Sequence, residues 1–189
     1  MDAASPCHLT NPPSISVAAA FTAPSARAAV EVSLGVIPPG SRMAAAIRHV
    51  LELRDQGLSW ADARDRIGDA YGHYAWVHTI NNAAIVVLGL LWSDGDFTTA
   101  VGNTVMAGLD TDSNGATVGS VAGILAGTSG LPRNLIEPLH NRTRSALLVS
   151  ITRRSPTWPT ELLLLPFAVS VREGPSRETC AVARNSHRR

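Results

Sequence analysis

The chain has 189 residues, 45% of them hydrophobic, which is enough for a single domain with a substantial core. Its formal net charge of +1 provides no general attraction to nucleic acid or to an anionic membrane, so neither is expected as a partner. All 16 residues counted as Lys or Arg are arginine, which excludes chemistry that requires a lysine, such as a Schiff base or a phosphate-binding P-loop.

Residues 1–13 read as a leader that is unrelated to the rest of the chain or disordered. They contain no positively charged segment followed by an apolar one, so no secretory signal is predicted. No stretch reaches the roughly 18 apolar residues of a membrane span. The two cysteines, Cys7 and Cys180, lie near opposite ends and indicate neither a disulfide framework nor a cysteine zinc cluster. We therefore expect a cytoplasmic protein.

Residues 14–148 are predicted to form an all-α domain of consecutive helices. After a short Ala-rich segment, Ser25 and Ser41 stand where they can cap two helices whose apolar residues recur at spacings of three and four. Gly57 ends the second of these helices. No stretch alternates with the period of a strand, so the fold class is all-α.

Further helices follow along the chain. Ser59, with Asp62 three residues later, resembles a capping box in which Asp replaces Glu. Residues 82–92 are apolar on nearly every side, which predicts a central, buried helix. Asp96 is expected to cap the next helix.

The composition changes near residue 148. Residues 149–189 form an Arg- and Pro-rich, divergent tail with one compact apolar run. We expect this tail to be an extension that packs poorly, with at most one short helix or strand, because its composition supports little burial.

The most informative segment, residues 108–127, reads GLDTDSNGATVGSVAGILAG. Asp110, Asp112 and Ser113 lie within four residues at a turn into a last long helix, which is expected to follow Asp112 and run to about Gly127. Hard cations such as Mg²⁺, Mn²⁺ or Ca²⁺ prefer carboxylate and hydroxyl oxygens. The alternative is structural: Asp112 or Ser113 caps the helix, and Asp110 is a turn residue.

Two other metal motifs share these letters, and both fail. An EF-hand loop would have Gly115 in its sixth place, but its twelfth place, which needs a bidentate Glu, is Val121. The Asp-x-Asp motif of aspartyl phosphatases needs a buried strand before it, whereas here a helix precedes it and no lysine is present to assist a phosphate.

Glycines recur every four residues along the same helix, at Gly115, Gly119, Gly123 and Gly127. A glycine inside a helix costs about 1 kcal/mol relative to alanine. The stripe therefore predicts that another helix packs closely against this face and so fixes the helix end that carries the aspartates.

This segment closely resembles the C-terminal metal signature of the ADP-ribosylglycohydrolases, the dinitrogenase reductase-activating glycohydrolase family. The resemblance extends back through HTINNAAIVVLGLLWSDGDFTTAVGNTVMAG at 78–108 and IPPGSR at 37–42, and forward through GLP at 130–132 to about Leu147. It implies a compact multi-helix fold that hydrolyses N- or O-glycosidic bonds of ADP-ribose with a pair of divalent cations, Mg²⁺ or Mn²⁺.

By matched position, the resemblance implies that Asp110, Asp112 and Ser113 are metal ligands. It also implies an ADP-ribosylated protein or an ADP-ribose-type small molecule as the substrate. It identifies no catalytic acid or base in this chain.

Candidate substrate contacts lie close to these ligands in the same resemblance. His78 and Asn82 stand four residues apart at the start of the buried segment, with a helix-capping role as the preferred interpretation. Asn114 and Gly115 are further candidates, with Asn114 also expected to support the turn. The tryptophans Trp60, Trp76 and Trp92 are predicted to be packing residues rather than a stacking platform.

The chain departs from the family in one respect. The family's other metal ligands come from an N-terminal Thr/Ser-Asp-Asp motif, which does not occur in this sequence. The expected function is a divalent-metal-dependent ADP-ribosylglycohydrolase, and the alternative is a catalytically incomplete helical fragment or half of a split enzyme. A truncated domain would leave residues 83–91 and the glycine-rich helix exposed, so self-association is expected.

Overall fold

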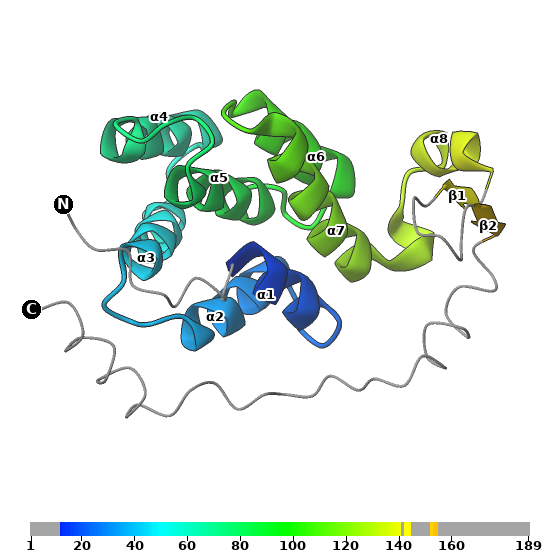
Figure 1. Cartoon of the computed structure of the whole chain (residues 1–189), viewed down its shortest axis with the longest axis horizontal. Coiled ribbons are helices and arrows are strands. Elements are labelled where there is room, and N and C mark those ends of the chain that lie inside the picture. Colours follow the sequence, from blue (N-terminus) through cyan, green and yellow to red (C-terminus); the bar gives the residue numbers. More distant parts are fainter. Residues whose placement is uncertain (1–11, 141, 145–151, 155–189) are drawn as a thin grey trace, which may run out of the picture. The chain divides into compact units, whose positions relative to one another are not determined.

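The computed structural model describes residues 12–140, 142–144 and 152–154. The chain divides into two units at the boundary between Ile136 and Glu137. Figure 1 shows the order of the helices and strands along the chain. Most of the predicted leader and, apart from 152–154, the predicted tail lie outside the described residues.

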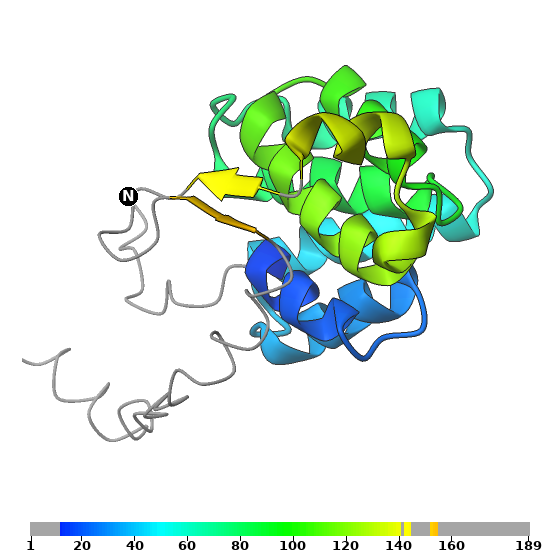
Figure 2. The same ribbon diagram turned by 90° about the vertical axis from the view of Figure 1, so that its right-hand side faces the viewer.

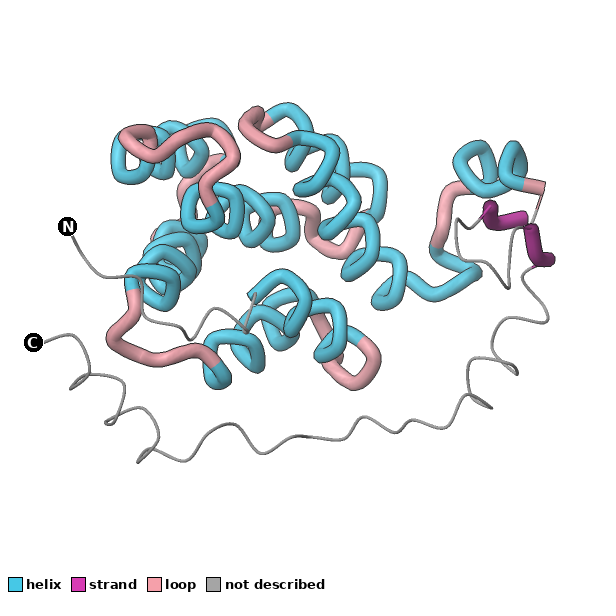
Figure 3. The backbone as a smooth tube through the Cα atoms, viewed as in Figure 1, coloured by secondary structure: helices cyan, strands magenta, loops and turns pink. Residues whose placement is uncertain are grey.

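Residues 12–136 form helices and connecting loops only, which confirms the all-α class (Figure 3). The helices are α1 (Pro12–Ala20), α2 (Ala26–Val36), α3 (Arg42–Asp55), α4 (Trp60–Tyr71), α5 (Thr79–Leu91), α6 (Phe97–Met106), α7 (Thr111–Gly130) and α8 (Arg133–Ile136). None of the helices in the described residues is long and apolar enough to cross a membrane.

Four helices begin at the side chains that the sequence predicts as caps. Ser25, Ser41, Ser59 and Asp96 each accept a hydrogen bond from the backbone N–H three residues later. The Ser59 hydroxyl also donates to the Asp62 carboxylate at 2.6 Å. Asp62 is shorter than the Glu of a standard capping box, and it bonds to the capping side chain.

Helix α5 forms the centre of the first unit, as its apolar sequence predicts. It contacts α1, α2, α3, α4, α6 and α7, and every residue from Ile80 to Leu91 is buried (Figure 1). The expectation that residues 83–91 would be exposed is therefore wrong, because neighbouring helices cover them. Self-association itself stays a prediction.

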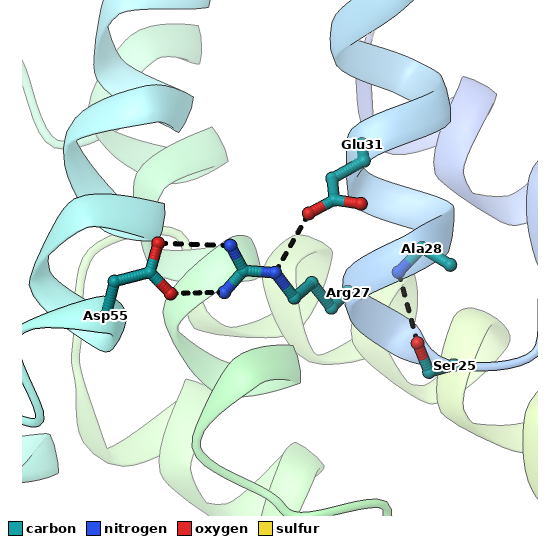
Figure 4. Close-up of polar contacts among 5 residues, drawn as sticks. All are labelled: Ser25, Arg27, Ala28, Glu31 and Asp55. Atoms are coloured by element: carbon teal, nitrogen blue, oxygen red, sulfur yellow. Dashed lines mark hydrogen bonds and ion pairs between the residues drawn. The ribbon is translucent and has the colours of Figure 1, made fainter.

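An exposed arginine joins α2 to α3 (Figure 4). The Arg27 guanidinium donates to both carboxylate oxygens of Asp55, at 2.6 and 3.1 Å, and to Glu31 at 2.8 Å. Hydrogen bonding to Asp55 and Glu31 raises the pKa of Arg27, and hydrogen bonding to Arg27 lowers the pKa of Asp55. Because solvent screens exposed pairs, this contact orients the two helices more than it stabilises them.

Helix α6 packs against the glycine stripe of α7, and the two helices lie side by side (Figures 1 and 2). Each of the first three glycines faces a large apolar side chain of α6, one turn apart in antiparallel order. The pairs are Gly115 with Val105, Gly119 with Val101, and Gly123 with Phe97. The predicted close packing is thus confirmed for these three positions.

The fourth glycine of the stripe has a different role. Gly127 has a φ of 62° and a ψ of 177°, which is not helical, and it kinks α7. Only glycine adopts this part of backbone space without strain.

Replacing Gly119 with alanine is expected to raise the free energy of unfolding by about 0.5 to 1 kcal/mol. A Cβ at this position would lie 3.7 Å from Cγ2 of Val101, an ordinary van der Waals distance, so the gain in helix propensity is not opposed by a clash. At Gly115 the matching distance is 3.3 Å, and alanine there should gain less. Urea unfolding measures both, and a loss of stability in the Gly119 variant would contradict this packing.

The second unit begins with a 3₁₀ turn, Glu137–Leu139. Two short strands follow, β1 (Arg142–Arg144) and β2 (Thr152–Arg154), paired antiparallel with Thr143 opposite Arg153. β1 lies within residues 14–148, for which the sequence predicts only helices, so this strand is a difference. β2 lies in the predicted tail, where one short helix or strand is expected. Pro132 and Pro138 shorten the helical segments here, because proline cannot continue a helix.

Candidate functional site

The chain reverses between α6 and α7 in a tight turn. Gly108 and Leu109 have φ values of 87° and 64°, both in the left-handed region. A leucine rarely adopts this conformation, which costs about 1 kcal/mol or more and marks a segment held by its surroundings. The turn leads directly to Asp110, the N-cap residue of α7.

The three predicted metal ligands lie together at this helix start. Asp110 occupies the N-cap position, but its side chain makes no capping hydrogen bond. Asp112 and Ser113 belong to the first helical turn and are exposed, while Asp110 is half-buried. The alternative in which Asp112 or Ser113 caps the helix is therefore wrong, because α7 begins earlier, at Thr111.

The two carboxyl groups interact with each other. Hydrogen bonding to the Asp110 carboxyl lowers the pKa of Asp112, and the backbone N–H groups of Ser113 and of Asp112 itself lower it further. The partial positive charge at the start of a helix favours carboxylates in the same way. These contacts favour the ionised form of Asp112.

The donor set of this turn fits a hard cation. Two carboxylates and a hydroxyl are oxygen ligands of the kind that Mg²⁺ and Mn²⁺ prefer. In the described part of the chain, no group of three or more His, Cys, Asp or Glu side chains is placed to hold a metal ion. Water or substrate oxygens would therefore complete the coordination, as is usual for Mg²⁺.

Asn82, a predicted substrate contact, is buried and connects this turn to α5. Its side-chain oxygen accepts from the backbone N–H of Asp110 at 3.1 Å and from the Asn114 amide at 2.7 Å. Its amide nitrogen donates to the backbone oxygens of Trp76, at 2.8 Å, and His78, at 2.9 Å. A side-chain amide has two donors and two acceptor positions, so the hydrogen-bonding capacity of Asn82 is used inside the protein.

The other predicted substrate contacts have structural surroundings. Nδ1 of His78 accepts from the backbone N–H of Ile80 at 3.2 Å, which confirms the preferred helix-capping role. Its ring stacks on Tyr74, with centroids 4.3 Å apart. Asn114 is buried against Asn82, and Gly115 faces α6. Direct substrate contacts by these residues stay a prediction.

A hollow of about 230 Å³ adjoins the turn. Side chains from α4, from the loop after it, from the start of α5 and from the turn after α6 line it. The lining includes Arg64, Tyr71, Tyr74, Trp76, Asn81 and Leu109, with Ile67 and Ile85 among the apolar members. Because Leu109 directly precedes Asp110, the pocket and the aspartates are neighbours.

Sequence reasoning missed the role of Trp76. It predicts three packing tryptophans, and Trp92 is indeed buried, with its indole N–H donating to the Leu58 oxygen. Trp60 is partly buried against the core. Trp76, however, is 63% exposed and lines the pocket, so the prediction is wrong there. Its position in a loop between two helices, beside two tyrosines and two histidines, is the signal that could have identified it.

Two polar side chains define the chemistry of the pocket wall. Arg64 donates from Nε and Nη2 to the Ala107 oxygen, at 3.4 Å each, and remains 44% exposed. Tyr71 lies with its hydroxyl 3.2 Å from Nδ1 of His49, and burial raises its pKa. The wall thus presents a cation and a neutral phenol.

Comparison with known proteins gives one match. A family model described as ADP-ribosylglycohydrolase matches residues 9–160. No curated protein and no solved structure matches the chain.

Proposed function

Because the chain belongs to the ADP-ribosylglycohydrolase family, we propose that it binds ADP-ribosyl groups at the pocket and the α7 turn and hydrolyses their glycosidic bond with the help of Mg²⁺ or Mn²⁺. The substrate would be an ADP-ribosylated protein or an ADP-ribose-type small molecule.

The observation that carries this proposal is the state of Asp110. A carboxylate at an N-cap position normally accepts a hydrogen bond from the first helical turn. Here the Asp110 side chain makes no such bond, and Asp112 stands two residues later in the first turn of α7. Two adjacent carboxyls without a cation between them repel when both are ionised, which supports a cation as their natural partner.

The pocket supports a nucleotide-like substrate. At about 230 Å³ it is smaller than the roughly 300–1,000 Å³ of sites that enclose a whole drug-sized ligand, so it suits one ring of ADP-ribose. Tyr74 and Trp76 supply aromatic faces for a base. Arg64, the one arginine among the lining residues, is suited to a diphosphate by charge.

The residues of the proposed site would have separate roles in binding and hydrolysis. Asp110, Asp112 and Ser113 would hold the cation, which when bound orients ribose hydroxyls and a water. The pocket wall would fix the nucleotide end of the substrate, and Leu109 would set the separation between the two. The neutral Tyr71 would add a hydrogen-bond donor without adding negative charge.

The test is a calorimetric Mn²⁺ titration of the full chain beside its Asp110→Ala/Asp112→Ala variant. The variant is expected to bind Mn²⁺ at least about 100-fold more weakly, because it loses both charged ligands. The matched control is Glu31→Ala/Asp69→Ala, which removes the same charge from exposed positions on α2 and α4 that do not line the pocket. The control should bind as the parent does.

The outcomes separate the two interpretations of the chain. Mn²⁺ binding that only the Asp110/Asp112 variant loses supports the hydrolase and justifies assays of ADP-ribose release. Equal heats in all three proteins, or none, would refute the metal site. The chain would then act as a catalytically incomplete fragment or would need a separate half to complete it.

A further inference from the structure

We propose that Asn82 is a positioning residue that couples the pocket to the metal-binding turn, so that filling one strengthens binding at the other. This inference rests on the function proposed above and adds to it a device within the same site.

Four hydrogen bonds of the Asn82 side chain lead to the two parts of the proposed site. The amide nitrogen donates to the backbone oxygens of Trp76 and His78, in the loop that forms one wall of the pocket. The side-chain oxygen accepts hydrogen bonds from the backbone N–H of Asp110 and from the Asn114 amide, at the start of α7. One buried side chain thus bonds to both halves of the site.

The turn before α7 has a strained backbone conformation. Gly108 and Leu109 both have positive φ, so this segment needs outside contacts to hold it. The bond from Asp110 N–H to Asn82 is such a contact, and it acts on the backbone of a proposed ligand. Residues that orient metal ligands in this way typically change metal affinity by about 10- to 100-fold.

The pocket loop connects α4 to α5. Trp76 lies in this loop, outside any helix, and its side chain is exposed. The Asn82 amide donates a hydrogen bond to the backbone oxygen of Trp76. A base stacked in the pocket would order this loop, and with it the Asn82 amide. A second ligand that meets an already ordered site has less entropy to lose, which is positive coupling.

Adenosine is the suitable probe, because it has no phosphate and cannot chelate Mn²⁺ through a diphosphate. In the parent, saturating adenosine is expected to lower the Kd of Mn²⁺ by about 5-fold or more, the usual scale of coupling between sites. In Asn82→Ala this factor should fall below about 2, and Mn²⁺ alone should bind about 10-fold more weakly.

Asn103→Ala is the matched control. Asn103 is a half-buried asparagine on α6 that donates to the Trp92 backbone oxygen at 3.2 Å and lines no part of the pocket. This variant loses a comparable hydrogen bond and should retain the coupling of the parent. If Asn82→Ala does not fold, Asn114→Ala removes only the bond at 2.7 Å and should reduce the coupling at least about 2-fold.

Each result is decisive. Coupling that is lost in the Asn82 or Asn114 variant and kept in Asn103→Ala supports the inference. Full coupling in a folded Asn82→Ala protein overturns it. A parent whose Mn²⁺ affinity does not change with adenosine, whether or not adenosine binds, overturns the inference and leaves the proposed metal site standing, whereas a parent that binds no Mn²⁺ refutes both.

Discussion

Replacing Gly89 with alanine is expected to lower the free energy of unfolding by about 2 kcal/mol. Gly89 lies in the middle of α5, and a Cβ there would overlap the side-chain oxygen of Thr104 on α6. Thr104 is fully buried, and its hydroxyl donates to the Ala100 oxygen at 2.7 Å, so it cannot turn aside without losing that bond. The helix propensity gained by alanine, about 1 kcal/mol, is smaller than this overpacking cost.

Two further variants separate the overlap from other effects. In a Thr104→Ala background, Gly89→Ala should cost less than about 1 kcal/mol, since the overlapping oxygen is gone. The remaining neighbours, Cβ of Thr104 and the Ala100 oxygen, would lie at 3.0 and 3.1 Å, so the relief is partial. Gly35→Ala, in an open part of α2, should not destabilise. Urea unfolding of the set measures the coupling, and a Gly89→Ala protein as stable as the parent would refute this packing of α5 on α6.

Replacing Gly68 with leucine is expected to weaken ADP-ribose binding at least about 10-fold, because the larger side chain would fill part of the pocket. Gly68 lies on α4 and lines the pocket. A Cβ there would lie 3.7 Å from Nη1 of Arg64, so the backbone accepts a side chain without a clash. Stability should be unchanged or higher, since leucine is a better helix former than glycine.

Gly35→Leu is the control for this experiment. Gly35 is also an exposed helical glycine, and nothing lies within 4 Å of a Cβ at its position. Calorimetry with ADP-ribose in the presence of Mn²⁺ should give parental affinity for Gly35→Leu and a weaker one for Gly68→Leu. Equal affinities would show that the ligand binds elsewhere.

The sequence by itself determined the helices and the family. The caps at Ser25, Ser41, Ser59 and Asp96 follow from hydrogen bonds that span three residues, so the local sequence contains all that they need. The buried helix α5 follows from an apolar run, and the family follows from the segment around Asp110 and Asp112. The glycine stripe predicts close packing, and α6 provides it.

Only the tertiary structure decided how the site is assembled. Asp110, the N-cap residue of α7, donates its backbone N–H to Asn82, which lies 28 residues away in the sequence. Arg64 of α4 and Leu109 line the same pocket, although they lie far apart in the sequence. Trp76, a predicted packing residue, is exposed and lines this pocket as well. Local patterns report contacts within a few residues. Contacts between distant segments depend on how whole helices pack, and no short stretch of this sequence contains that information.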